Sequence, residues 1–324
     1  LPARIEAVEA MSALVRERGD LLSTTTGWAA ALDALRAGDD RDNFVAGAGD
    51  VFPRRRKRKD DAAVVIAGWS AAAFVVSDVL PAWLAAGAEA ETPRAGGSSR
   101  GPFLAERLRS ASPALARVVP LLASYASQTD DVRTSLSAVN ALWNACDAVV
   151  VAKPPSSAES DKIASASLLF ETVLTRAFEA LAAVGVDRRR PDVRHSGVNT
   201  LAKLLAARGA TLSPAAWRGA TLGVFFPLAF EIRARAAAAG DERVDAEPLD
   251  DSDDAETDPD ARPPAVLLVH HSRNTVAKQW DETLAAAVAA VGELARKRAA
   301  RLLAPETRDA FEPVWAETCA FMAE

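Results

Sequence analysis

Apolar residues along this chain recur every three or four positions, and the clearest example lies between Arg188 and Leu228. This spacing places them on one face of an α-helix. They are Val198, Leu201, Leu204 and Leu205. The flanking residues fit the ends of such a helix: we predict Asp192 as its N-cap and Gly209 as its C-cap, with Arg208 in the last turn. A second apolar helix, from Trp217 to Phe230, is predicted to follow.

A similar pattern opens another helix hairpin earlier in the chain. There, Asp130 and Asp131 precede an apolar series that consists of Val132, Leu136, Ala138, Val139, Leu142 and Trp143. Near the start, the order Arg-Gly-x-x-Leu-Ser at residues 18–23, followed by Trp28, echoes the same order at residues 208–213, followed by Trp217. Each hairpin has an apolar face that it cannot bury alone, so successive hairpins are expected to stack. An ordinary Ala-rich helical bundle is the alternative.

Composition favours helices over strands. Ala and Leu dominate the chain, aromatic residues make up 6% of it, and Val and Ile never alternate with polar residues over a long run. We therefore predict an all-α fold, a HEAT/armadillo-type α-solenoid of stacked helical hairpins that runs as a single array over residues 1–324. A compact fold of this length would divide into two domains, whereas a solenoid has a linear core.

Three segments interrupt the helical pattern and are predicted to be long, disordered loops: residues 37–61, 88–102 and 241–264. Charged residues, Gly, Ser and Pro leave these segments too few apolar side chains to form a core. The first segment contains the basic run Arg54–Lys59, which could contact anionic lipid or act as a nuclear signal. A solvated loop, balanced by the acidic third segment, is the favoured interpretation.

The longest apolar run, Ala62–Ser77, ends at Asp78 and is shorter than the roughly 20 residues that a membrane-spanning helix needs. We predict a buried helix of the solenoid here, and no transmembrane segment. The chain begins at Leu1 without an initiator Met and shows no signal-peptide pattern. We expect it to be an excerpt of a longer protein.

Charge and cysteine content bound the possible partners. A net charge of −6 and an isoelectric point near 5.3 give no reason to expect a nucleic-acid partner. The two cysteines, Cys146 and Cys319, lie far apart and form no CxxC pair. This usage favours a reducing compartment and argues against a zinc or disulfide framework.

No sequence pattern indicates a catalytic centre. Residues Gly97–Gly101 match GxSxG, but the serine of that motif needs a strand before it and a helix after it, and here it lies in a low-complexity segment. The chain has no Walker-type phosphate loop. Adjacent His270 and His271 would point in different directions on a helix or a strand, which makes a poor metal chelate. We predict a non-enzymatic protein without catalytic residues, cofactor or metal.

The segment Leu267–Thr283 is the candidate for binding a protein partner. Trp and Arg often anchor interfaces, although a Trp at helical spacing is more often part of a core. Both interpretations of Trp280 therefore stay open. The candidate partner-binding residues are His270, His271, Arg273, Lys278 and Trp280.

A helix is predicted within this segment, with Ser272 or Asn274 as its cap. The residues expected on one face of it are Val276, Trp280, Thr283 and Leu284. Arg273 and Lys278 fall elsewhere on the helix, where they could face a partner.

Four segments, in this order, resemble the C-terminal half of the Mon-two family (monensin-sensitivity proteins), which are relatives of the large brefeldin-A-inhibited Arf exchange factors. The segments are TSLSAVNALWNACD (134–147), RPDVRHSGVNTL (190–201), RGATLSPAAW (208–217) and HHSRNTVAKQWDET (270–283). The last is quite specific to that family, whereas HEAT proteins at large share the PDVR hairpin. The resemblance extends from about Arg4 to Leu303. Two residues depart from the family pattern: His195 and Gly197 stand where we expect Asn and Ala.

This resemblance implies a large cytoplasmic protein, peripheral on Golgi, trans-Golgi network and endosome membranes. It implies a non-catalytic scaffold or regulator of vesicle trafficking between the trans-Golgi network and endosomes or the vacuole. The implied partners are a Dopey-type protein, an aminophospholipid flippase and Arf-like GTPases. The alternative is a regulator of Arf-type GTPases with guanine-nucleotide exchange activity, which needs a residue placed beside the magnesium and phosphate of the GTPase. No candidate for that residue stands out.

Overall fold

The computed structural model describes residues 2–17, 25–37, 59–81, 116–151, 161–244 and 275–323. Helices joined by short connections make up these ranges, and no strand occurs within them. The prediction of an all-α fold is therefore confirmed.

The helices follow one another in chain order. Their bounds are α1 (Pro2–Glu17), α2 (Thr25–Ala37), α3 (Lys59–Phe74), a helix at 116–127, α6 (Val132–Val151), α7 (Asp161–Gly185), α8 (Pro191–Arg208), α9 (Pro214–Ala220), α10 (Phe226–Val244), α11 (Val276–Leu302) and α12 (Pro305–Ala323).

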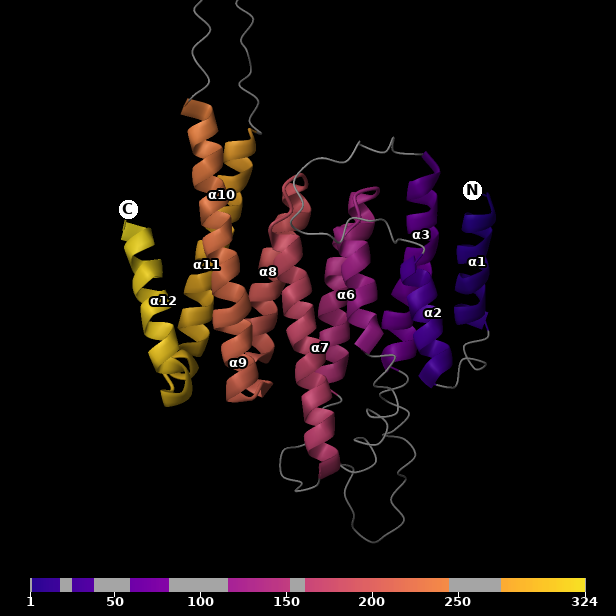
Figure 1. Cartoon of the computed structure of the whole chain (residues 1–324), viewed down its shortest axis with the longest axis horizontal. Coiled ribbons are helices and arrows are strands. Elements are labelled where there is room, and N and C mark those ends of the chain that lie inside the picture. The colour runs from indigo at the N-terminus through magenta and orange to yellow at the C-terminus, as the bar shows by residue number, and fades with distance from the viewer. Residues whose placement is uncertain are drawn as a thin grey trace, which may run out of the picture.

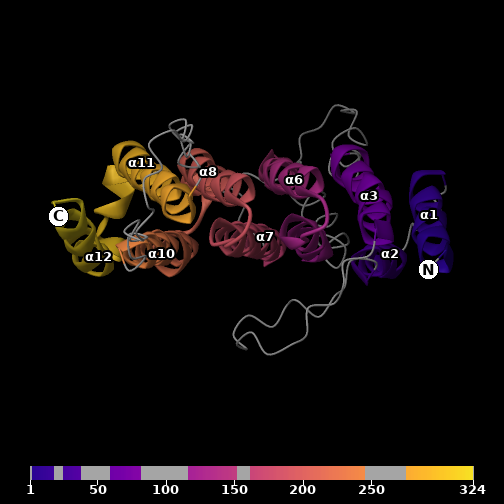
Figure 2. The same cartoon turned by 90° about the horizontal axis from the view of Figure 1, so that it is seen from above.

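These helices stand side by side in one row, with the two termini near its opposite ends (Figure 1). Seen from above, the row has two layers (Figure 2). The upper layer of that view contains α3, α6, α8 and α11, and the lower layer contains α2, α7, α10 and α12. A two-layered row of consecutive helices is a solenoid-like arrangement, as the sequence predicts.

The core is a line of apolar side chains along the row, which extends from Val15 in α1 to Phe311 in α12. Trp217, Leu201 and Leu205 are fully buried, as expected of core residues. Trp143, also expected in the core, is partly buried and packs against it.

The start of α8 differs from the prediction. The N-cap is Arg190, and Pro191 is the first helical residue, so Asp192 lies in the first turn instead of capping it. The physical reason is that Asp187 already binds the turn before the helix: its Oδ1 accepts hydrogen bonds from the backbone N–H groups of Arg189 and Arg190. In the first turn, the carboxylate of Asp192 still suits the helix dipole.

The end of α8 follows the prediction in its position. Gly209 is the C-cap, but its φ of −54° lies in the right-handed region, and the chain continues as a 3₁₀ turn over Gly209–Thr211. Here glycine is needed for space, because a Cβ atom at Gly209 would overlap the ring of Trp217. The close approach of Trp217 thus determines this end of the helix.

The predicted second helix of this hairpin is longer than expected. It begins at Pro214, where the Ser213 hydroxyl caps it by accepting a hydrogen bond from the backbone N–H of Ala216. After α9 it passes through a π-helical turn over Thr221–Phe225 and continues as α10 to Val244.

The long apolar run forms α3 and a π-helical turn over Val75–Val79. Within the described residues, it contains the one window, Ala62–Val79, that is long and apolar enough to span a membrane by length and composition, and 39% of that window is buried inside the fold. Core helices of soluble proteins also pass this test. The helix contacts α1, α2 and α6, but it is only partly buried, so the prediction of a buried helix is confirmed for one side of it only.

The predicted loops fall mostly outside the described ranges, and residues 88–102 do so entirely. Three of their boundaries fall in described helices, since Ala37 is the last residue of α2. Helix α3 already begins at Lys59, and α10 extends to Val244, so the predicted segments 37–61 and 241–264 each overlap a helix.

Candidate interaction surface at the start of α8 and α11

Arg194, from the PDVR motif, is a completely buried cation in the first turns of α8. Its guanidinium donates three hydrogen bonds: Nε to Thr283 Oγ1 at 2.7 Å, Nη1 to the Asp187 carbonyl at 2.8 Å, and Nη2 to the Gln279 carbonyl at 2.9 Å. The planar, five-donor fork of arginine allows this set of contacts. Arg194 therefore joins α8 to α11 across about 90 residues of sequence, as the separation of 89 between Arg194 and Thr283 shows.

The guanidinium of Arg194 also stacks on Trp280. Its Cζ lies 3.9 Å from the ring centroid, and Cζ of Arg235 in α10 lies 5.6 Å from the same centroid. Such cation–π contacts are stronger when water is excluded, and the Trp280 side chain is 5% exposed. The PDVR motif of α8 and the segment around Trp280 in α11, which are far apart in the sequence, thus meet in one buried cluster.

Burial lowers the pKa of Arg194, and the nearby charge of Arg235 adds to this, whereas the charge of Asp187 acts in the opposite direction. The ordinary pKa of arginine is so high that the side chain keeps its charge at neutral pH. The cluster therefore contains a permanent positive charge that carbonyl groups and a ring stabilise.

Arg190 reaches the opposite way along the row, towards α6. Its Nη1 donates to Ser135 Oγ at 2.8 Å and to the Gln128 carbonyl, and its Nε donates to Asp187 Oδ2 at 2.8 Å. Arg190 and Arg194, four residues apart, therefore tie the start of α8 to both neighbours. We call the contacts of these two arginines the first arginine row.

A second arginine row lies at the other end of the same helices. Arg208 at the end of α8 pairs with Asp147 in α6, and Arg298 in α11 donates to the carbonyl groups of Ala206 and Ala207. Backbone carbonyls at a helix C-terminus lack partners within the helix, so an arginine from the next helix satisfies them. Arg301 adds a hydrogen bond to the Leu212 carbonyl.

Of the predicted partner-binding residues, the structure describes Lys278 and Trp280. Lys278 is exposed near the start of α11, whereas Trp280 is buried, so for this ring the structure favours the core interpretation. His270, His271 and Arg273 lie outside the described residues. Partner binding by this set stays a prediction.

Details of the predicted helix need correction. Its N-cap is Thr275, whose hydroxyl accepts a hydrogen bond from the Lys278 backbone N–H, so neither Ser272 nor Asn274 caps it. Thr283 shares the buried face of Trp280, but Val276 is 59% exposed. The N-cap therefore lies one residue after Asn274, because threonine is also among the side chains that cap helices.

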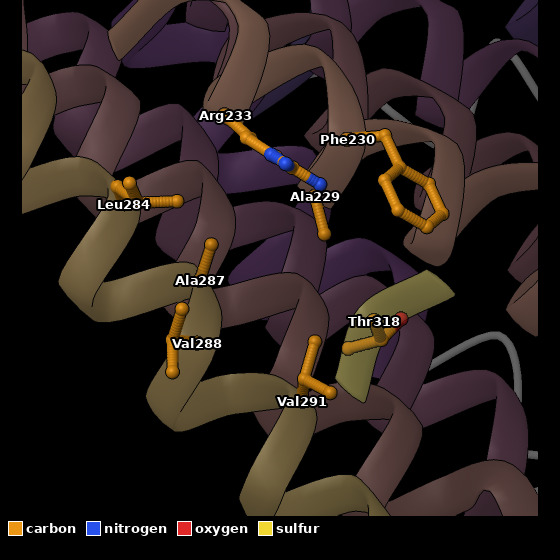
Figure 3. A pocket seen from close by; sticks show the side chains of 8 residues that line it. All are labelled: Ala229, Phe230, Arg233, Leu284, Ala287, Val288, Val291 and Thr318. Carbon is orange, nitrogen blue, oxygen red and sulfur yellow. The ribbon is translucent and has the colours of Figure 1, made fainter. Parts of the chain in front are cut away.

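A shallow hollow lies between α10, α11 and α12 (Figure 3). It encloses about 320 Å³, including the space at its open mouth. The residues that line it are Ala229, Phe230, Arg233, Leu284, Ala287, Val288, Val291 and Thr318. Such a lining can bury an apolar group, but it pairs no nucleophile with a base.

Metal-binding and thiol chemistry find little support in the described part of the chain. No group of three or more His, Cys, Asp and Glu side chains there could hold a metal ion. Burial raises the pKa of Cys146 to about 12, so its thiol stays protonated, and Cys319 lies exposed on α12.

Comparison with known proteins decides the family. Residues 111–317, well over half of the chain, match the family model described as the C-terminal region of Mon2 protein. The chain belongs to the Mon2 family. The match contains α6–α11, both arginine rows and the segment around Trp280.

Individual Mon2 proteins are similar over about half of the chain. A Protein MON2 homolog from Drosophila melanogaster is 30% identical over 172 residues, which is 50% of this chain and 9% of that protein. The Monensin-resistant homolog 2 of Caenorhabditis elegans is 27% identical over 187 residues, which is 58% of this chain and 10% of that protein. The chain thus corresponds to about a tenth of the length of these Mon2 relatives. No solved structure matches it.

The two departures from the expected Mon2 pattern lie in the first half of α8. A Cβ atom at Gly197 would come within 3.0 Å of Gly185 N and Leu181 O, so glycine allows a close approach of α7 and α8 in this Mon2 chain. At His195, burial and the charge of Arg194 lower the pKa of the imidazole, with burial the larger cause. His195 is therefore neutral at pH 7.

The sequence missed the central part of this region. The local pattern does not distinguish Asp187 or Arg190 from other charged residues, and it shows Arg194 only as part of a repeat motif. Their partners in α6 and α11 lie 55 to 89 residues away, and spacing over such lengths carries no local signal. The available signal is a cluster of two Asp and four Arg side chains within the eight residues 187–194, at the start of a hairpin.

Proposed function

We propose that this chain is part of a non-catalytic scaffold or regulator of vesicle trafficking between the trans-Golgi network and endosomes or the vacuole. Membership of the Mon2 family is the observation that supports this role. The solenoid-like stack of helices also fits, because such stacks serve as extended binding surfaces. The proposal places the protein on the cytoplasmic side of Golgi and endosome membranes, as a peripheral component.

The proposed partners are proteins: a Dopey-type protein, an aminophospholipid flippase and Arf-like GTPases. We propose that Lys278, at the exposed start of α11, contributes to their capture together with Arg273, which precedes this helix in the sequence. Support comes from the way the structure fixes this helix. Trp280, two residues after Lys278, is held between α8 and α10 by Arg194 and Arg235. Lys278 therefore projects from a rigid base, which lowers the entropy lost on binding.

Affinity capture from a cell lysate, with mass spectrometry of the bound proteins, tests the proposal. The chain is compared with an Arg273→Glu, Lys278→Glu variant and with a Lys203→Glu control. Lys203 is also an exposed helical lysine, but nine residues after Arg194 it lies about 13 Å further along α8. We expect the chain and the control to retain Dopey-type or flippase proteins, and the double variant to lose them. Equal recovery by all three would contradict the assignment to α11.

A nucleotide-release assay separates scaffold from exchange factor. Purified Arf-type GTPase loaded with a fluorescent nucleotide is mixed with the chain, and release is followed against GTPase alone. A pure scaffold leaves the rate unchanged. Accelerated release would favour the alternative, in which the chain itself promotes exchange.

A further inference from the structure

Helix α11 has a joint one turn before its end. At Arg298 the backbone leaves the helical conformation, with φ −130° and ψ 17°, so that Ala299–Leu302 form a separate last turn. The side chain of Arg298 is also bonded to the end of α8, through the carbonyl groups of Ala206 and Ala207. Hinges in proteins are formed by one or a few such residues, which absorb a change in φ and ψ. A rotation at this joint leaves the contact between α8 and α11 in place.

The last turn of α11 is bonded to the first turn of α12. The hydroxyl of Thr307, a residue that is 1% exposed, lies 2.8 Å from the Arg301 carbonyl and 3.0 Å from the Leu302 carbonyl, to which it donates. The backbone N–H of Thr307 donates to the Ala304 carbonyl at 2.9 Å. Because these bonds cross the turn between the two helices, the last turn of α11 moves together with α12. We call residues 299–323 the α12 unit.

Two arginine side chains donate to carbonyl groups across the boundary of the α12 unit. Arg301 donates to the Leu212 carbonyl before α9, and Arg218 in α9 donates to the Glu306 carbonyl. The first of these bonds is only partly buried and the second is exposed. A single hydrogen bond of this kind contributes little to stability, so both can break without unfolding the row.

The apolar packing of α12 is close at its base and open further along. Near the base, the ring of Phe311 lies against that of Phe226, with 5.8 Å between centroids. Beyond this contact, the hollow described above separates α12 from α10 and α11, and Figure 3 shows Thr318 of α12 at its edge, beside Val291 of α11. Thr318 is nevertheless 7% exposed, so in this arrangement α12 covers its own side of the hollow.

We propose that α12 is a hinged lid: the α12 unit turns about Arg298 as one body and thereby opens and closes the hollow between α10, α11 and α12. The position of α12 at the edge of the row leaves it room to move (Figure 1). Segments with few contacts commonly open as cooperative units, at a free energy below that of global unfolding. The proposal goes beyond the trafficking function above and does not depend on it.

Hydrogen exchange of the full chain, followed by mass spectrometry, tests whether α12 opens as a unit. The chain is compared with Arg218→Met, which removes one bond to the α12 unit without changing the sequence of that unit. Arg176→Met is the matched control, because Arg176 is also exposed and donates to a backbone carbonyl, that of Ala116, in another part of the row. Circular dichroism melts confirm that both variants are folded; if Arg218→Met is not, Arg218→Gln replaces it.

We expect the backbone amides from Ala299 to Thr318 to share one opening free energy, lower than that of α8. Arg218→Met should raise all their exchange rates by the same factor, about threefold to tenfold, which corresponds to one hydrogen bond. Arg176→Met should leave them unchanged. Protection that falls steadily along α12 would indicate fraying and contradict the hinge. An effect confined to the amides next to Glu306, or protection of α12 equal to that of α8, would contradict it as well.

Thiol labelling tests whether this motion opens the hollow. Thr318→Cys is made in a Cys319→Ser background, because Cys319 is exposed and would itself react, whereas Cys146 is buried. We expect the thiol at position 318 to react slowly in the closed arrangement. Adding Arg218→Met should raise its rate by the factor measured in hydrogen exchange. If the rate does not change, α12 is no lid over the hollow, and the proposal is wrong.

Discussion

At the scale of the residue, small side chains decide where helices approach closely. Gly209 and Gly219 illustrate the difference. At Gly209 an added Cβ would overlap the Trp217 ring, whereas at Gly219, near the end of α9, nothing lies within 4 Å of the added atom. One glycine is needed for packing, and the other only lowers the helix propensity of its segment.

We expect opposite effects from the same substitution at these two positions. Gly209→Ala should lower the free energy of unfolding by about 1–3 kcal/mol, because Trp217 has to move within a packed core. Gly219→Ala should raise it by about 0.5–1 kcal/mol, because alanine favours a helix. Urea titration followed by circular dichroism measures both changes. A neutral Gly209→Ala would show that the ring of Trp217 can shift without loss.

Single residues were predicted well where local pattern decides them. Trp217, Leu201 and Leu205 follow from helical spacing, and the end of α8 at Gly209 follows from the preference of glycine for C-caps. The burial of Trp280 could not be decided, since a ring at helical spacing suits either a core or an interface. Its packing depends on Arg194, which comes from a distant helix.

At the scale of the element, hairpins are joined by arginine side chains as well as by apolar contacts. Arg194 supplies donors to the buried hydroxyl of Thr283 and to the part-buried carbonyl groups of Asp187 and Gln279. Leaving such acceptors without a donor is costly, typically about 1–3 kcal/mol for each group. The contact between α8 and α11 therefore depends strongly on this one side chain.

Arg194→Met keeps most of the length of the side chain but removes its donors. We expect it to lower the free energy of unfolding by about 3 kcal/mol. Arg194→Lys should recover part of the loss, because one ammonium group cannot reproduce the planar fork. Lys203→Met, at an exposed position of the same helix, is the control and should change stability little. If Arg194→Met were as stable as the control, apolar packing alone would join the two helices.

Element boundaries could be predicted only in part. The helices α6 and α8 begin near the expected residues, since Pro and Asp mark helix starts. The π-helical turns at Val75–Val79 and Thr221–Phe225 have no signal in the apolar pattern. They add a residue to one turn of the helix, and only the packing of the neighbouring helices shows that this is favourable.

At the scale of the whole molecule, the helices form a row and not a sphere (Figure 1). A compact domain of 324 residues has a radius of gyration of about 20 Å. We expect small-angle X-ray scattering from the purified chain to give a clearly larger value, with an asymmetric distance distribution typical of a rod. A value near 20 Å with a symmetric distribution would indicate that the row collapses in solution.

The overall architecture was predictable because it repeats. Echoes such as the one between Trp28 and Trp217, both buried, report a unit that occurs several times. The contacts between helices were less predictable, because each of them joins residues of different repeats and no single motif contains both partners. Sequence pattern therefore describes the repeating unit better than the joints between units.

The two arginine rows have a mechanical consequence. Hairpins that are joined along only one edge can rotate apart about that edge. Here α8 is bonded to both α6 and α11 at each end. The contacts near its start are made by Arg190 and Arg194, and those near its end by Arg208 and Arg298. Opening either edge would separate charged groups from their acceptors. The stretch from α6 to α11 therefore resists bending, so that a displacement of the helices at one end is transmitted to those at the other end.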